Sequence, residues 1–281
     1  MAQRRLLPAD LYQPPCSGVN HSEISSLGTC MNVSKRPVAL ITGGSHGVGA
    51  ATATAFAKVG YDVVFTYRNK AARASDVAAA LVQHGVRALA VQGDMTSAVD
   101  RDALRLRLQE WSGRLNALVL NASGGLERDL IAADPHYGMR INRDAQVAFL
   151  DMALPLLERG STVVFVTSHW AHLYGRVEQI PAYAPVAESK HAGEQALRAR
   201  QDELTDRGIR LIVVTGDIIE GTITPKLLER GAPGLAAQRR ETVGRLPTAE
   251  DLGRGIAAAT LDPSLPSGHT IVIGGALTSL T

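Results

Sequence analysis

The stretch that decides the fold is Thr42-Gly43-Gly44-Ser45-His46-Gly47-Val48-Gly49, residues 42–49. It follows a short apolar run over residues 38–41 and precedes a helical pattern over residues 50–59. Glycines at these positions permit a tight turn and let backbone N–H groups approach a pyrophosphate, whose charge the following helix N-terminus favours. The order of strand, loop and helix therefore predicts a dinucleotide-binding unit.

Residues 37–281 alternate short, β-branched apolar runs with longer helical patterns. This alternation is typical of a parallel sheet that helices cover on both faces, with ligands beyond the carboxyl ends of the strands. We therefore expect a single α/β domain with a doubly wound, Rossmann-type sheet. Strands are predicted over residues 38–41, 62–67, 88–92, 117–120, 162–167, 209–214 and 270–273. Helices are predicted over residues 50–59, 71–84, 99–111, 134–157, 185–206 and 249–259.

The composition of the 281-residue chain, with 45% apolar and 20% charged residues, is typical of a globular protein. A formal net charge of +2 gives no reason to expect a nucleic-acid partner. No apolar run approaches the roughly 20 residues that span a bilayer, so no membrane partner is expected. The histidines lack the spacing of metal ligands, and no metal site is predicted.

Residues 1–36 are rich in Pro, Ser, Gly and Asn and have no helical or strand periodicity. We interpret them as a disordered tail, or as sequence upstream of a product that starts at Met31. Cys16 and Cys30 are the only cysteines, so no disulfide framework holds the predicted domain. This cysteine usage favours a reducing, cytoplasmic compartment.

The end of the second predicted strand indicates which nucleotide binds. An Asp or Glu there accepts hydrogen bonds from the ribose of NAD, whereas an Arg accommodates the 2′-phosphate of NADP. Residues 65–70 read Phe-Thr-Tyr-Arg-Asn-Lys and contain no carboxylate. Arg68 is the predicted phosphate partner, with Lys70 nearby and His46 assisting, so NADP(H) is the predicted cofactor. The alternative is a solvated basic helix start.

Several further motifs follow the loop in a consistent order. They are Gly93-Asp94-Met95-Thr96, Asn121-Ala122-Ser123-Gly124, Ile141-Asn142, Val166-Thr167-Ser168 and the stretches 245–251 and 267–275. Together with the loop, they resemble the short-chain dehydrogenase/reductase family over about residues 37–275. The resemblance implies an enzyme that transfers a hydride to or from a carbonyl compound. It also implies a homodimer or a homotetramer.

The resemblance assigns roles to individual positions. Asp94 falls in the turn that contacts adenine, and Asn142 falls where the family has an asparagine that bends a helix and holds a proton-relay water. The predicted cofactor-binding residues are Thr42, Gly43, Ser45, His46, Gly47, Val48, Gly49, Tyr67, Arg68, Asp94, Met95, Asn121, Ala122, Ser123, Lys190, Gly216, Ile218 and Thr222.

The catalytic segment departs from the family pattern. In the family a Ser orients the carbonyl and a Tyr donates the proton, four residues before a Lys that lies on the same helix face. Ser168 and Lys190 fit this pattern, but Val186 occupies the position of the tyrosine. The nearest phenol is Tyr183, seven residues before Lys190, or about 10 Å along a continuous helix. Pro185 fits best in the first helical turn, which would leave Tyr183 in the entering loop.

Three interpretations of this departure remain open. In the first, Tyr183 is a displaced proton donor, and Asn142, Ser168, Tyr183 and Lys190 form the catalytic set. In the second, hydride still moves but the proton comes from His169, Tyr174 or water, because an imidazole can donate near neutrality. In the third, the fold binds a nucleotide without redox turnover, as a non-redox enzyme or a cofactor-sensing regulator.

The substrate is expected to lie between residues 169–175 and 216–244. His169, Trp170 and Tyr174 are the predicted substrate wall, and residues 231–234 are a predicted mobile lid. An aromatic, histidine-rich wall favours a bulky ketone or a quinone-like compound of specialised metabolism. We therefore hypothesise an NADPH-dependent carbonyl reductase, with a nucleotide-binding protein that transfers no hydride as the alternative.

Overall fold

The computed structural model describes residues 36–230 and 232–280. The predicted tail, apart from Arg36, lies outside these residues, and so do both cysteines and residue 231 of the predicted lid. The predicted lid is therefore described only from residue 232 onward.

Within the described residues, seven strands form one parallel sheet in the order β3-β2-β1-β4-β5-β6-β7. The chain crosses over between β3 and β4, so the strand order reverses beside β1, as in a doubly wound fold. The predicted fold class is confirmed. The strands are β1 (Val38–Ile41), β2 (Asp62–Tyr67), β3 (Ala88–Gln92), β4 (Leu115–Leu120), β5 (Leu157–Ser168), β6 (Arg210–Gly216) and β7 (Thr270–Ile273).

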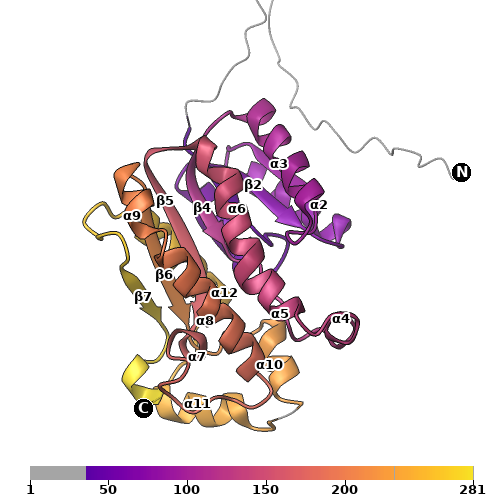
Figure 1. Ribbon diagram of the computed structural model, residues 1–281, viewed down its shortest axis with the longest axis vertical. Coiled ribbons are helices and arrows are strands. Elements are labelled where there is room, and N and C mark those ends of the chain that lie inside the picture. The colour runs from indigo at the N-terminus through magenta and orange to yellow at the C-terminus, as the bar shows by residue number, and fades with distance from the viewer. Residues whose placement is uncertain (1–35, 231, 281) are drawn as a thin grey trace, which may run out of the picture. The chain divides into compact units, whose positions relative to one another are not determined.

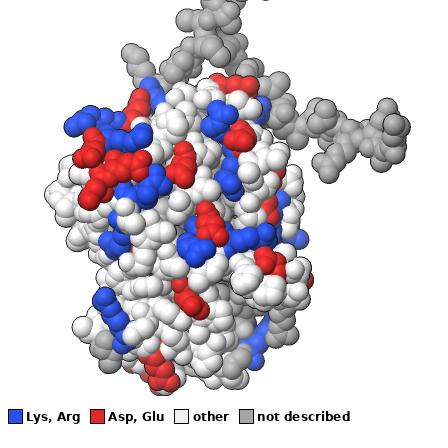
Figure 2. Space-filling model, in the orientation of Figure 1, with Lys and Arg blue, Asp and Glu red and all other residues white. Residues whose placement is uncertain are grey.

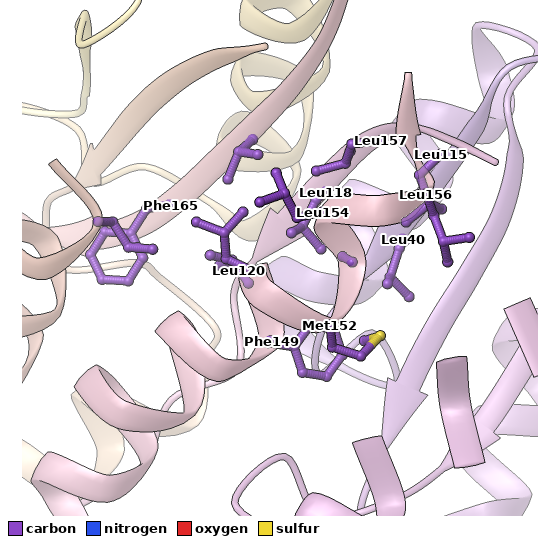
Figure 3. Packing of buried hydrophobic residues seen from close by; sticks show 14 of the residues in the cluster. Leu40, Leu115, Leu118, Leu120, Phe149, Met152, Leu154, Leu156, Leu157 and Phe165 are labelled. Carbon is purple, nitrogen blue, oxygen red and sulfur yellow. The ribbon is translucent and has the colours of Figure 1, made fainter. Parts of the chain in front are cut away.

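Helices cover both faces of this sheet because the strands are apolar on both sides (Figure 1). Val163 and Phe165 of β5 belong to one buried cluster, whereas Val164 and Val166 belong to the other. The first face carries α3 (Ala98–Trp111), α6 (Ala145–Ala153), α8 (Ala184–Arg198) and α9 (Gln201–Asp206). The second face carries α1 (Gly47–Lys58), α2 (Ala71–Val82) and α12 (Ala249–Leu261). Figure 3 shows the cluster of the first face.

The prediction of one continuous helix over residues 134–157 is wrong. It is divided into α5 (Tyr137–Met139), a π-helical turn η1 (Arg140–Asp144), α6 and a 3₁₀ turn η2 (Leu154–Leu156), and β5 then begins. A π-helical turn shifts the hydrogen-bond register and frees a backbone carbonyl. The Nε2 of Gln146 donates to the carbonyl of Ile141 in this turn at 2.9 Å.

Two other segments also differ from the predictions. The helix predicted over residues 185–206 is interrupted between α8 and α9, because the backbone of Arg200 leaves helical geometry. Residues 215–248, for which no helix is predicted, contain α10 (Ile223–Leu228) and α11 (Leu235–Val243). Shorter elements are α4 (Arg128–Ala133), α7 (His169–His172) and η3 (Leu277–Leu280).

Charge is mixed over the face of the molecule that Figure 2 shows, where Lys and Arg are interspersed with Asp and Glu. Among the described residues, no helix is long and apolar enough to cross a membrane. The same residues contain no His, Cys, Asp and Glu group arranged to hold a metal ion.

Candidate active site

A cavity of about 820 Å³ lies at the carboxyl ends of β1, β2, β4, β5 and β6. This is the location predicted for ligands in a doubly wound sheet. The cavity brings together nearly all the predicted cofactor-binding residues. Those that line it are Gly43, Ser45, His46, Gly47, Val48, Gly49, Tyr67, Arg68, Asp94, Met95, Asn121, Ala122, Ser123, Lys190, Gly216, Ile218 and Thr222.

The glycines of the loop are required by close packing. A Cβ at Gly44 would collide with the side chain of Phe65, and a Cβ at Gly49 would collide with the carbonyl oxygen of Gly43. No side chain caps the N-terminus of α1, since His46 makes no capping hydrogen bond. The first N–H groups of the helix are therefore available to an anion in the cavity.

Thr42 has a different role from the one predicted. It is fully buried and does not line the cavity. Its Oγ1 donates to the carbonyl of Val119 at 3.3 Å and accepts from the N–H groups of Asn121 and Ala122, both at 2.9 Å. Thr42 thus joins the loop to the end of β4 and does not contact the ligand space.

Basic side chains gather at the end of the cavity next to β2. His46, Arg68, Lys70 and Arg73 all line it. Burial lowers the pKa of His46, and the positive charge of Arg73 lowers it further. The guanidinium of Arg68 donates to the hydroxyl of Tyr137 at 2.9 Å. This end of the cavity therefore suits a second anionic group, apart from the pyrophosphate site at α1.

Ser168 and Tyr183 meet at the other end of the cavity. Ser168 ends β5 and is paired with Gly216 of β6, and its Oγ accepts from the N–H of Ala171 at 3.2 Å. The hydroxyl of Tyr183 donates to the same Oγ at 3.0 Å. Burial raises the pKa of the Tyr183 phenol, and the hydrogen bond with Ser168 offsets only part of the rise.

The local chain direction explains how Tyr183 reaches this position. Tyr183 precedes the first residue of α8, and Pro185 lies in the first helical turn. The N–H of Tyr183 donates to the carbonyl of Ile180 at 2.8 Å, so a turn delivers the phenol to the cavity. Val186, in the family position of the tyrosine, lines the cavity with an apolar side chain.

Lys190 and Asn142 lie behind this pair. Lys190 lines the cavity with 8% of its surface exposed, and burial lowers its pKa to about 8. Asn142 lies in the π-helical turn and is 1% exposed. Its Nδ2 donates to the carbonyl of Gly124 at 2.8 Å and to Ser189 Oγ at 2.9 Å. The Asn142 side chain therefore holds the segment after β4 against α8 and does not line the cavity.

The predicted substrate wall is corrected at two of its three positions. Trp170 lines the cavity, but His169 and Tyr174 do not. His169 is fully buried, with Nδ1 bonded to Thr215 Oγ1 at 3.0 Å and Nε2 to the carbonyl of Gly275 at 2.9 Å. Burial lowers its pKa, which disfavours an imidazolium donor. Tyr174 packs near the ring of His191 instead.

The structure adds residues that sequence reasoning missed. Apolar side chains from α7, α8, α10 and the loops between elements line the cavity and cluster with Tyr183. Leu126, Ile180 and Leu228 were named by no prediction, and they join Trp170, Val186 and Ile218 there. Arg73 and Tyr137 join the basic end of the cavity. Arg73 follows Lys70 by three residues at the start of a helix, a spacing that the sequence does contain.

Comparison with known proteins identifies the family. Residues 37–230 match the family described as short chain dehydrogenase. The chain therefore belongs to this family of oxidoreductases, and the predicted class of enzyme is confirmed.

Individual relatives cover most of both chains. A 1-cyclohexenylcarbonyl-CoA reductase of Streptomyces collinus is 28% identical over 249 residues, which are 86% of this chain and 87% of the relative. A hydroxynaphthalene reductase-like protein of Metarhizium majus is 27% identical over 261 residues, 86% of this chain and 95% of the relative. A short chain dehydrogenase from Burkholderia cenocepacia, crystallised in complex with NADP, has a TM-score of 0.74 and 28% identity. That likeness covers 86% of this chain and 98% of the other. The predicted homo-oligomer and cytoplasmic location stay predictions.

Proposed function

We propose that this enzyme is an NADPH-dependent reductase of bulky, apolar carbonyl compounds, in which Tyr183 donates the proton. The observation that carries this proposal is the hydrogen bond from the Tyr183 hydroxyl to Ser168 Oγ at 3.0 Å, inside the cavity. Two neighbouring hydroxyl groups can both hydrogen-bond to one carbonyl oxygen, so that one orients the carbonyl and the other protonates it.

The residues around the cavity fit NADPH. The glycine loop would hold the pyrophosphate, because no side chain caps the first N–H groups of α1. Arg68, with Lys70 and Arg73, would hold the 2′-phosphate at an end where β2 has no carboxylate. Lys190, whose ammonium makes no ion pair in the described residues, would bind the ribose hydroxyls. When bound, NADPH supplies the hydride.

In the reaction, Ser168 orients the carbonyl and Tyr183 completes the reduction. A substrate oxygen entering between the two hydroxyls would take over the hydrogen bond that Tyr183 now donates to Ser168. As the carbonyl carbon gains the hydride, its oxygen becomes negative and takes the proton of Tyr183, whose phenolate then regains a proton from solvent. The free phenol is protonated at neutral pH, and burial raises its pKa further above neutrality.

The apolar wall favours a substrate with a ring beside its reactive carbon. Trp170, Ile180 and Leu228 come from three segments around the reactive hydroxyls. Burial of such a ring would stabilise the complex by about 25 cal/mol per Å² of apolar surface. The names of the relatives, which refer to hydroxynaphthalene and cyclohexenyl compounds, support ring substrates of specialised metabolism.

A second candidate is reduction of a carbon–carbon double bond conjugated to a carbonyl. Hydride addition at the β-carbon places the negative charge on an oxygen that lies farther from that carbon. Tyr183 lies three residues before the position that the family uses. The name of the Streptomyces collinus relative, which refers to an unsaturated acyl-CoA, supports this candidate.

Deuterium transfer tests these candidates together. NADPH stereospecifically deuterated at C4 is incubated with a panel of cyclic ketones, quinones and cyclohexenyl thioesters, and the products are located by NMR. Deuterium on a former carbonyl carbon supports the proposal, and deuterium at the β-carbon supports the second candidate. NADPH binding without transfer to any compound would instead indicate a nucleotide-binding protein without turnover.

A further inference from the structure

A hydrogen bond joins two walls of the cavity at its basic end. Arg68 follows β2 and Tyr137 begins α5, 69 residues later in the chain. The Nη1 of Arg68 donates to the Tyr137 hydroxyl at 2.9 Å. The backbone of Arg68 is fixed as well, because its carbonyl accepts from Gln92 Nε2 at 3.0 Å.

The hydroxyl of Tyr137, which accepts this hydrogen bond, is held in place by a buried ring. The residue is 5% exposed and belongs to the buried cluster of the first sheet face. Its Cε1 lies only 2.9 Å from where a Cβ of Gly124 would be, so the segment after β4 packs directly on the ring. The hydroxyl is therefore presented to the cavity from a fixed position.

The guanidinium of Arg68 keeps most of its hydrogen-bonding capacity for a ligand. One N–H is used by Tyr137, and in the described part of the chain its other N–H groups make no hydrogen bond or ion pair. Among the described residues Arg68 forms no ion pair with Glu127, which accepts from two backbone N–H groups, or with Asp94, which accepts from Thr96. A planar guanidinium held at one corner can still bind a phosphate bidentately through the opposite edge.

We propose that Tyr137 is a specificity-determining residue that positions Arg68 for the 2′-phosphate of NADP(H). A free arginine side chain loses rotamer entropy when a ligand fixes it. The hydrogen bond to Tyr137 fixes Arg68 before the ligand arrives, so part of this loss no longer opposes binding. The preference applies only to the phosphorylated cofactor, since NAD has no group at this place. This inference rests on the proposed use of NADP(H).

The test measures dissociation constants of NADP⁺ and NAD⁺ by calorimetry for the wild type, Tyr137→Phe, Arg68→Ala and the double variant. We expect Tyr137→Phe to weaken NADP⁺ binding about three- to tenfold, because Arg68 must then lose more of its rotamer entropy on binding, and to leave NAD⁺ binding within about twofold. In the Arg68→Ala background, Tyr137→Phe should have no further effect. Tyr61→Phe is the matched control, because Tyr61 is a buried tyrosine that packs on Phe56 outside the cavity.

Three outcomes would overturn the inference. Unchanged NADP⁺ binding in Tyr137→Phe would show that Arg68 needs no positioning, and tighter binding would show that Tyr137 competes with the phosphate. Equal weakening of NADP⁺ and NAD⁺ would indicate a structural role alone. If the proposed use of NADP(H) were wrong, Arg68→Ala would leave the ratio of the two dissociation constants unchanged. This result distinguishes a wrong cofactor from a wrong role of Tyr137.

Discussion

Replacement of Tyr183 by Phe separates the proposed proton donor from its surroundings. The substitution removes one hydroxyl and preserves the ring that fills its buried site. A positioned general acid contributes about 10²–10⁴ in rate, or roughly 2.7–5.4 kcal/mol of transition-state stabilisation. The hydroxyl makes one neutral hydrogen bond, to Ser168. Its loss should therefore lower the free energy of unfolding by only about 0.5–1.5 kcal/mol.

The assay follows NADPH oxidation with a substrate identified by deuterium transfer, together with thermal unfolding of each variant. We expect kcat to fall at least a hundredfold while the dissociation constant of NADPH stays within about twofold. Tyr174→Phe is the matched control, since Tyr174 lies near His191 outside the cavity. A loss of less than about tenfold in a folded Tyr183→Phe protein would refute the assignment of Tyr183 as donor.

Three further predictions concern stability, each measured by denaturant unfolding of the cofactor-free protein. Burial lowers the pKa of Lys190 from 10.5 to about 8, so its ammonium destabilises the fold at neutral pH. Lys190→Met should be more stable than the wild type by up to about 3 kcal/mol at pH 7. This gain in stability should disappear as the pH rises from about 8 to 10.5. A gain that stays constant with pH would contradict the prediction. Arg239→Met should lower the free energy of unfolding by about 3–5 kcal/mol, because it leaves the buried Asp217, 2.9 Å from Arg239, without its partner. Adding Asp217→Leu should recover part of this loss. Gly193→Ala should lower the free energy of unfolding by about 1–3 kcal/mol, since its Cβ would collide with the backbone carbonyl of Asn142. An unchanged stability would contradict the close packing of α8 on the π-helical turn.

Local sequence patterns predict the sheet and the cofactor loop well, because both depend on short-range chemistry. Every predicted strand overlaps an observed one, and Gly44 and Gly49 of the loop occupy positions where larger residues would collide. The π-helical turn was missed because a shift in hydrogen-bond register leaves apolar periodicity almost unchanged. His169 was misplaced because it begins α7 directly after β5 and turns toward Gly275, a contact that spans 106 residues.

The basic end of the cavity shows the same limit of local reasoning. Arg68 was predicted from its place after β2, but Tyr137 belongs to no motif and meets it only through the tertiary fold. The meeting of Tyr183 with Ser168 likewise depends on the turn at Ile180, and a seven-residue spacing from Lys190 does not reveal that turn.

The position of Tyr183 just before α8 has a consequence for how specificity can change. A donor one helical turn from the lysine is held by the helix, independently of the substrate loop. Here the proposed donor hydroxyl belongs to the loop that also supplies Ile180 to the apolar wall and, through Gln179, hydrogen-bonds the backbone of Trp170. With Tyr183 as the proposed donor, mutations that reshape this wall for another substrate are expected to move the acid as well. Substrate selectivity and proton delivery would then change together.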